Sequence, residues 1–129
     1  MALRIVRLGT PRAPSEGPRL GTVRRPPRGV RKADYARRDF YDAWLPDLAP
    51  SAALVRSVLG QPSDASWRRF EKRYRAEMAR PGPARLLEVL ALLSRSANFS
   101  VGCYCENEAR CHRSILRRLL AERGAKLLR

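Results

Sequence analysis

This sequence of 129 residues is poor in the side chains that hold disulfide frameworks together. It contains three cysteines, Cys103, Cys105 and Cys111, and a single histidine, His112. The cysteines are odd in number, and two of them lie only two positions apart, where a mutual disulfide would be strained. We therefore expect no secreted disulfide scaffold but a cytoplasmic protein whose thiols stay reduced.

Long apolar runs are also missing. No stretch approaches the roughly 18 to 20 apolar residues that a membrane helix requires, so we expect no membrane insertion. The N-terminal segment MALRIVRLGT has too short an apolar stretch for a signal peptide and no small-residue cleavage site. Apolar residues nevertheless make up 44% of the chain, which is enough for a core. The length predicts one domain over residues 1–129.

Acidic residues are scarce beside basic ones. The chain has 27 Lys and Arg against 12 Asp and Glu, a net charge of +15. Eleven of the basic residues, but only two of the acidic ones, fall in the first 38 positions. A field of this size attracts an anionic partner, either a small molecule or a nucleic acid. An arginine-rich composition would produce the same charge, so specific residues have to identify the partner.

The spacing of apolar residues predicts short strands alternating with helices. Strands are predicted at 3–8, 20–23 and 98–104, a short helix at 32–39, and further helices at 52–59, 64–79, 84–94 and 112–123. In the last strand, Phe99, Val101 and Cys103 alternate onto one face. We therefore predict an α/β fold, a single small domain with a short, mostly parallel or mixed sheet and about four helices packed on it.

Glycines and prolines mark several predicted boundaries. Gly29 is expected to adopt a positive φ in the turn after the second strand, and the last helix is expected to stop at Gly124. The Pro-Gly-Pro segment at 81–83 is expected to separate two helices. An apolar stripe with spacings of three and four runs along the helix before this segment and predicts a core-facing side. The stripe consists of Trp67, Phe70, Tyr74 and Met78.

All cysteines and the histidine fall between the last strand and the last helix. Three thiolates and one imidazole are an accepted tetrahedral zinc set, so these four residues are candidate metal ligands. They are Cys103, Cys105, Cys111 and His112. The spacing is unusual for zinc, because the adjacent side chains of Cys111 and His112 would point apart if both residues were helical.

Two other interpretations of this cluster stay open. A helix N-terminus lowers the pKa of a nearby thiol, which makes Cys111 or Cys105 a candidate nucleophile or redox thiol with His112 as its base. Alternatively, Cys103 and Cys105 are small buried strand residues, since free cysteine is among the most buried residue types.

Four motifs, spread over nearly the whole chain, carry a family resemblance. They are Pro27-Arg28-Gly29-Val30 with Lys32, Trp44-Leu45-Pro46 with Leu48-Ala49-Pro50-Ser51, the stripe from Trp67 to Glu77-Met78, and Cys111-His112-Arg113-Ser114 after Cys105. With them the chain resembles domain of unknown function 488, a family of small bacterial and archaeal proteins, including its YeaO-like branch and a branch with a C…CHR ending. The resemblance brings no established activity or substrate. The YeaO-like branch lacks these cysteines, which implies that the fold does not depend on zinc.

The resemblance also pairs two distant segments, because the first turn and the C…CHR ending hold polar motif residues without an evident packing role. If the two segments converge, they form a basic pocket; if they do not, Arg28 and Lys32 pair with the acidic residues of 39–47. The predicted anion-binding residues are Arg28, Lys32, Arg113 and Ser114. The predicted catalytic residues are His112, Cys111 and Cys105. The predicted function is binding of an anion in a basic pocket, and whether the protein also acts on a nucleotide or other phosphorylated substrate stays open. The alternative is a non-catalytic nucleic-acid-binding module stabilised by zinc.

Overall fold

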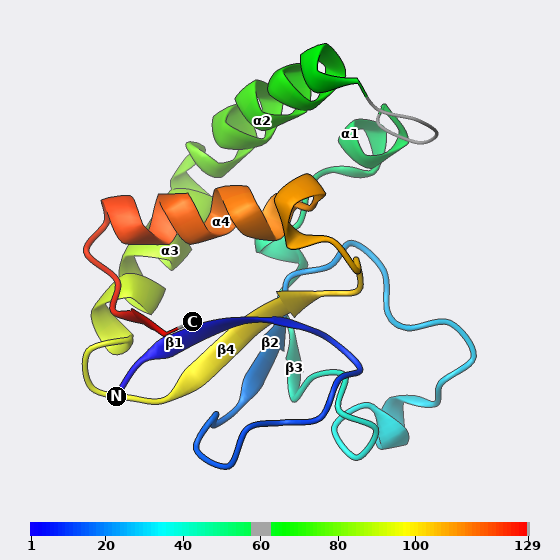
Figure 1. Cartoon of the computed structure of the whole chain (residues 1–129), viewed down its shortest axis with the longest axis vertical. Helices are drawn as coiled ribbons and strands as arrows, with labels where there is room; N and C mark the ends of the chain where they lie inside the picture. The colour runs from blue at the N-terminus through cyan, green and yellow to red at the C-terminus, as the bar shows by residue number, and fades with distance from the viewer. Residues whose placement is uncertain (58–62, 129) are drawn as a thin grey trace.

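The structure, a computed structural model, describes residues 1–57 and 63–128 (Figure 1). Its strands are β1 (Leu3–Arg7), β2 (Arg19–Gly21), β3 (Ala43–Trp44), β4 (Phe99–Cys103) and β5 (Leu127–Leu128). They form one five-stranded sheet in the order β3-β2-β4-β1-β5, and every neighbouring pair is parallel. The strand that carries Cys103 therefore lies at the centre of the sheet.

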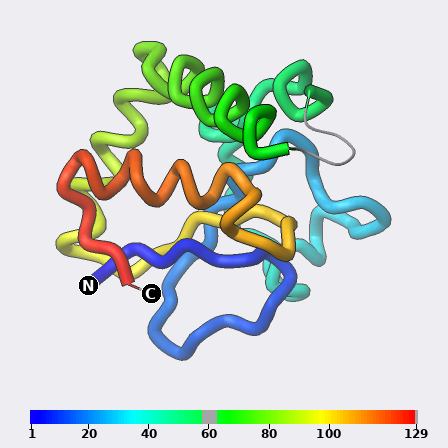
Figure 2. Tube along the Cα trace, turned by 45° about the horizontal axis from the view of Figure 1, so that its top comes forward, coloured from blue at the N-terminus to red at the C-terminus, as the bar shows by residue number. Residues whose placement is uncertain are grey.

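Four α-helices connect the strands in the described part of the chain. They are α1 (Ala52–Arg56), α2 (Asp64–Met78), α3 (Pro81–Leu93) and α4 (His112–Glu122). Helices α2, α3 and α4 lie on one side of the sheet, and the loop that follows β1 lies on the other (Figures 1 and 2). The loop that follows β2 leaves the end of the sheet and passes beside α1. This arrangement confirms the predicted α/β fold with a parallel sheet and about four helices. None of these helices is long and apolar enough to cross a membrane.

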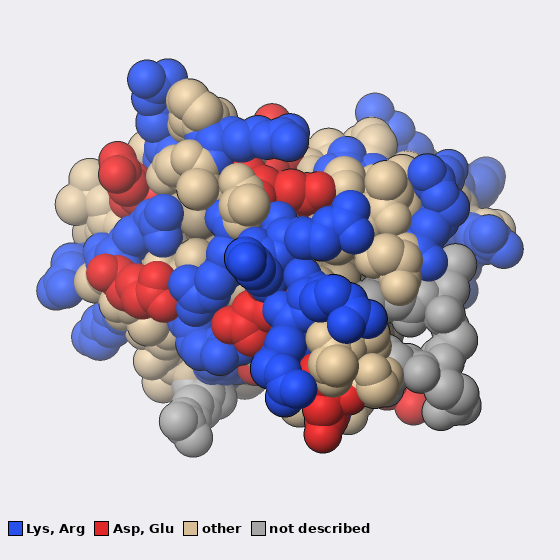
Figure 3. Space-filling model, turned by 90° about the horizontal axis from the view of Figure 1, so that it is seen from above, with Lys and Arg blue, Asp and Glu red and all other residues tan. Residues whose placement is uncertain are grey.

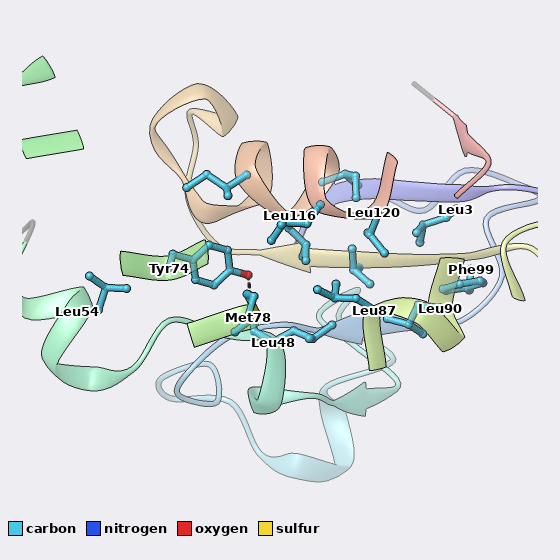
Figure 4. Close-up of a cluster of buried hydrophobic side chains, with 14 of the residues drawn as sticks. Leu3, Leu48, Leu54, Tyr74, Met78, Leu87, Leu90, Phe99, Leu116 and Leu120 are labelled. Atoms are coloured by element: carbon cyan, nitrogen blue, oxygen red, sulfur yellow. Dashed lines mark hydrogen bonds between the residues drawn. The ribbon is translucent and has the colours of Figure 1, made fainter. Parts of the chain in front are cut away.

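The core lies between the sheet and these helices (Figure 4). All five residues of β4 are buried, because β1 and β2 flank this strand on both sides. Ile115, Leu116, Leu119 and Leu120 of α4 pack over it. The predicted stripe of α2 is confirmed as core at Phe70, Tyr74 and Met78, whereas Trp67 is only partly buried at the edge.

Short elements account for most differences from the predicted boundaries. Strand β2 is shifted to Arg19–Gly21, and the two-residue strands β3 and β5 are too short to leave an alternating pattern. The predicted helix at 32–39 is wrong beyond its first residues. Only a 3₁₀ turn, η1 (Lys32–Asp34), forms there, and the backbone at Asp39 has a φ of 63°.

The proline segment at 81–83 begins a helix and does not precede one. Pro81 is the first residue of α3, where a missing N–H costs nothing and the fixed φ of proline suits the helix. The predicted end of the first helix near Leu59 and Gly60 lies outside the described residues. Both glycine predictions are confirmed, since Gly29 has a φ of 70° and Gly124, which follows α4, a φ of 80°.

Candidate functional site

A cavity of about 910 Å³ opens where the central strands end. Its walls come from the loop at 23–28 after β2, from α1, from the first turns of α2, and from the segments at 103–105 and 110–112. In a parallel sheet the carboxyl ends of the strands and the N-termini of the following helices meet at one edge, which is where ligands bind in such folds. The cavity therefore lies at the expected functional edge.

The cysteines and the histidine gather in the wall of this cavity. Cys103 is the last residue of β4, and Cys111 and His112 stand at the start of α4. The ligand atoms of these three buried residues lie within 4.8 Å of one another, close enough to hold one metal ion. Cys105 is exposed, and its Sγ lies 3.7 Å from Sγ of Cys103.

The side chains of Cys111 and His112 converge because their backbones differ. Cys111 is the N-cap of α4 and is extended, with a φ of −123° and a ψ of 151°, whereas His112 is the first helical residue. The expectation that these neighbours point apart assumed that both were helical, and the extended cap removes that assumption. Sγ of Cys111 consequently lies 3.8 Å from Nδ1 of His112.

A backbone carbonyl determines which nitrogen of His112 carries the proton. Nε2 lies 2.8 Å from the carbonyl oxygen of Thr22, at the end of β2. A carbonyl only accepts hydrogen bonds, so Nε2 carries the proton and donates it. Nδ1 then presents its lone pair to Cys111. A metal-binding histidine uses the same arrangement, with its outer N–H held by a carbonyl or carboxylate.

The three thiols change one another's acidity. Hydrogen bonds from Cys103 and Cys111 lower the pKa of Cys105 against the opposing effect of burial, and the charge of Arg113 adds to the lowering. A hydrogen bond with Cys103 is the largest cause that lowers the pKa of Cys111, and His112 contributes as well. The pKa of Cys103 is raised, because its proton is shared with these neighbours and its sulfur is buried. The three thiols therefore titrate together as one group.

Five arginines line the cavity, and none of the described lining residues is Asp or Glu. The arginines are Arg24, Arg25, Arg28, Arg56 and Arg110. Arg24 donates to the carbonyl oxygens of Pro46, Ala49 and Pro50. Arg110 pairs with Asp64. Within residues 1–57 and 63–128, the guanidinium groups of the other three make no hydrogen bond or ion pair.

The structure places the predicted anion-binding residues in different surroundings. Arg28 lines the same cavity as His112. Lys32 lines a separate, smaller pocket of about 440 Å³ beside Tyr35 and Asp42. Arg113 is 3% exposed and donates to the carbonyl oxygen of Cys105, outside the cavity lining. The hydroxyl of Ser114 donates to the carbonyl oxygen of Cys111, so it closes the first turn of α4.

Sequence reasoning overlooked Arg24, Arg25 and Arg56 as cavity residues. The run Arg24-Arg25-Pro26-Pro27-Arg28 contains the signal for two of them, because prolines hold the chain extended and expose the arginines beside them. Arg56 reaches the cavity only because α1 packs beside this loop, and no local pattern indicates that contact.

Comparison with known proteins assigns the chain to a family. A search of curated proteins and a search of solved structures each found no match. A family model described as the active DUF488-N3 subclade matches residues 3–124, which include the whole sheet apart from β5 and all of the cavity residues. The chain therefore belongs to the family of domain of unknown function 488, as its motifs indicated.

Proposed function

We propose that this protein binds a small anionic molecule in the cavity at the carboxyl edge of its sheet. The observation that carries the proposal is the lining itself, with five arginines and no carboxylate among the described residues. Guanidinium groups present paired N–H donors that match phosphate and carboxylate oxygens. Arg25, Arg28 and Arg56 supply the contacts, since Arg24 and Arg110 already have partners.

The proposed ligand is a nucleotide or another phosphorylated molecule that carries a flat ring. Cavities of about 300 to 1,000 Å³ enclose ligands of this size. Trp67 and Phe70 stack with their ring centroids 4.9 Å apart, and both line the cavity. Trp67 is the outer and less buried of the two, and the guanidinium of Arg110 lies over its ring, 5.9 Å from the centroid. A nucleobase would take the place of Arg110 on this ring while the other arginines hold phosphate.

We propose zinc as the metal of the cluster, held by Cys103, Cys111 and His112. Two soft thiolates and one imidazole are a donor set that zinc takes, and the outer N–H of His112 is already oriented by Thr22. Zinc would tie the end of β4 to the start of α4 and so keep the cavity wall in place. Three free cysteines agree with a reducing compartment, and we place the protein in the cytoplasm.

Fluorescence of Trp67 tests the anion site directly. The chain has two tryptophans, so Trp44→Phe leaves Trp67 as the single reporter. Titration with AMP and with inorganic phosphate should give a saturable signal for both, with tighter binding of AMP. Arg28→Gln combined with Arg56→Gln should weaken binding at least about tenfold, which corresponds to the loss of charged hydrogen bonds worth roughly 1.5 kcal/mol or more.

Arg73→Gln, an exposed change on α2 outside the cavity lining, is the matched control and should bind AMP as the parent does. The absence of a saturable signal, or equal binding by the double variant and the parent, contradicts the anion site.

Nucleic-acid binding is the second candidate and rests on a different observation. Seen from the helix side, basic side chains cover much of the surface and acidic ones are scattered among them (Figure 3). On α2, the exposed residues Arg68, Arg69, Lys72 and Arg73 have no carboxylate partner in the described part of the chain. Such binding would weaken steeply with salt, in proportion to the phosphates neutralised, whereas AMP binding in a cavity would respond far less.

A further inference from the structure

Arg113 is a buried cation without a carboxylate partner. Its side chain is 3% exposed, and no Asp or Glu among the described residues lies within ion-pair distance. One terminal nitrogen donates to the carbonyl oxygen of Cys105, and Nε has no hydrogen-bond partner within residues 1–57 and 63–128. Burying a charge is unfavourable unless an opposite charge or several hydrogen bonds compensate for it.

The position of Arg113 in its helix increases this cost. Arg113 is the second residue of α4, where the free N–H groups of the helix already create positive charge. A cation is stabilised at the C-terminal end of a helix and is unfavourable here. The surroundings must therefore supply negative charge. Glu108 near this end of α4 is already paired with Arg117, which leaves the sulfur atoms of the neighbouring cysteines.

We propose that Cys105 completes a four-ligand zinc centre with Cys103, Cys111 and His112, and that Arg113 is the counter-charge of this centre. The inference rests on the proposed zinc and names the fourth ligand and the residue that neutralises it. Zn²⁺ with three thiolates and one neutral imidazole has one net negative charge, and a single guanidinium beside it balances that charge. The carbonyl contact between Arg113 and Cys105 holds the guanidinium against the same loop.

Two distances within the cluster suit this centre. A zinc–sulfur bond of about 2.3 Å places two sulfur ligands of a tetrahedron about 3.8 Å apart. Sγ of Cys103 lies 3.7 Å from Sγ of Cys105, and Sγ of Cys111 lies 3.8 Å from Nδ1 of His112. The first two ligands come from the end of β4 and the other two from the start of α4, so each element contributes one pair. The group whose ligand atoms all lie within 4.8 Å of one another contains Cys103, Cys111 and His112, so the exposed side chain of Cys105 would turn inward to complete the centre.

Packing alone accounts for less of the structure. Cys103 and Cys111 would pack as small buried residues without a metal, at 7% and 2% exposure. Packing cannot explain Cys105, because this residue is exposed. It also leaves the charge of Arg113 buried without an anion.

Cobalt substitution counts the thiolate ligands. Metal-free, reduced protein titrated with Co²⁺ should develop a thiolate-to-cobalt charge-transfer band together with the visible bands of a tetrahedral site. Cys105→Ala should lower the charge-transfer intensity by about a third, since one thiolate of three is lost. Because Cys105 is exposed, this change leaves the core intact. An unchanged band intensity in Cys105→Ala would overturn its role as a ligand.

Competition with a chromophoric chelator tests the counter-charge. Arg113→Gln should weaken Co²⁺ binding by about 10- to 100-fold, the effect expected for a residue next to the ligands, and Arg113→Lys should restore most of the loss. The control is Arg85→Gln, an exposed change on α3 away from the cluster, which should bind as the parent does. Equal metal affinity in Arg113→Gln and the parent overturns the assignment.

The sign of the stability change separates a counter-charge from a packing residue. With metal bound, Arg113→Gln should lower the unfolding temperature. Without metal, it should leave that temperature unchanged or raise it, because an unpaired buried charge is removed. A packing residue would lower stability in both states, and that result overturns the proposal even where the variant folds poorly. Failure of Co²⁺ to bind the parent would overturn both this inference and the proposed zinc, whereas AMP titration reports the anion site independently.

Discussion

The Sγ atom of Cys111 lies 3.8 Å from Nδ1 of His112, although the two residues are neighbours in the sequence. Consecutive helical residues project about 100° apart, so a helix covering both would separate these side chains. An extended N-cap followed by the first helical residue brings them together. The start of α4 therefore shapes the cluster as much as the identity of its residues does.

Metal content is the first measurement that tests the cluster. Protein purified without a histidine tag or chelator should contain about one zinc ion per chain. Cys111→Ser should contain far less after dialysis, because a buried ligand is lost. Ser114→Ala is the control, since among the described residues its hydroxyl donates a hydrogen bond only to the carbonyl of Cys111, and its loss should leave the zinc content unchanged. If the parent contains no metal, Cys105 and Cys111 remain candidate nucleophiles, with His112 as the candidate base.

Alkylation should distinguish the thiols by their exposure. In reduced, metal-free protein, iodoacetamide should modify Cys105 first, because Cys103 and Cys111 are buried. Peptide mapping by mass spectrometry should then show one modified cysteine per chain at early times. Added zinc should slow the reaction, since a metal-bound thiolate is a weaker nucleophile. Early modification of Cys111 would contradict the described packing of the N-cap.

Breaking the buried ion pair between Glu16 and Arg19 should destabilise the fold strongly. Both side chains are almost fully buried, and Oε2 of Glu16 also accepts a hydrogen bond from the hydroxyl of Ser100 on β4. Glu16→Gln should lower the free energy of unfolding by about 3 kcal/mol at neutral pH, because it leaves the charge of Arg19 buried and unpaired. Urea denaturation measures the change. Glu122→Gln, at a half-exposed pair with Arg75, should cost less than about 1 kcal/mol.

The same pair predicts a direction of pH dependence. Burial would raise the pKa of Glu16, but hydrogen bonds from Arg19, Ser100 and the backbone of Ala13 outweigh it, so the pKa lies below its ordinary value of 4.5. The unfolded chain binds the proton more readily, and the stabilisation is therefore present above pH 4.5 and is lost as the pH falls toward the folded pKa. The stability difference between the parent and Glu16→Gln should shrink over this acid range. A difference independent of pH would contradict the ion pair.

Tyr74 links the core helices to the 3₁₀ turn η2 (Pro46–Leu48) next to the cavity wall. Its hydroxyl is buried and donates to the carbonyl oxygen of Leu48 at 2.7 Å. The centroid of its ring lies 5.5 Å from the centroid of the His112 ring. Tyr74→Phe should lower the free energy of unfolding by about 1 kcal/mol, since one buried hydrogen bond is lost while the ring remains. Thermal unfolding measures this cost. A stability equal to that of the parent would indicate that the hydroxyl does not make this contact.

Much of the fold follows from local sequence. The alternation of Phe99, Val101 and Cys103 predicts the buried face of β4, and the spacing of Phe70, Tyr74 and Met78 predicts the buried face of α2. Gly29 and Gly124 predict their turns correctly because few other residues adopt a positive φ. These features depend on residues close together in the chain, so a single sequence is enough to read them.

Local sequence does not predict the two-residue strands or the start of α3 at Pro81. A pair such as Ala43-Trp44 becomes a strand only because Leu20 and Gly21 of β2 lie beside it. A proline pair stops or starts a helix depending on where the following turn packs, and local spacing does not distinguish these outcomes.

By itself the sequence determined the chemical groups of the site, the family and the α/β architecture, because residue identity and periodicity are local properties. Tertiary structure alone decided that Arg28 joins His112 at one cavity, that Lys32 does not, and that Arg113 is buried beside the thiols. Those relationships depend on how the loop after β2 and the start of α4 approach one another across the sheet edge. Residues about 80 positions apart meet there, and only the packing of the whole chain sets such distances.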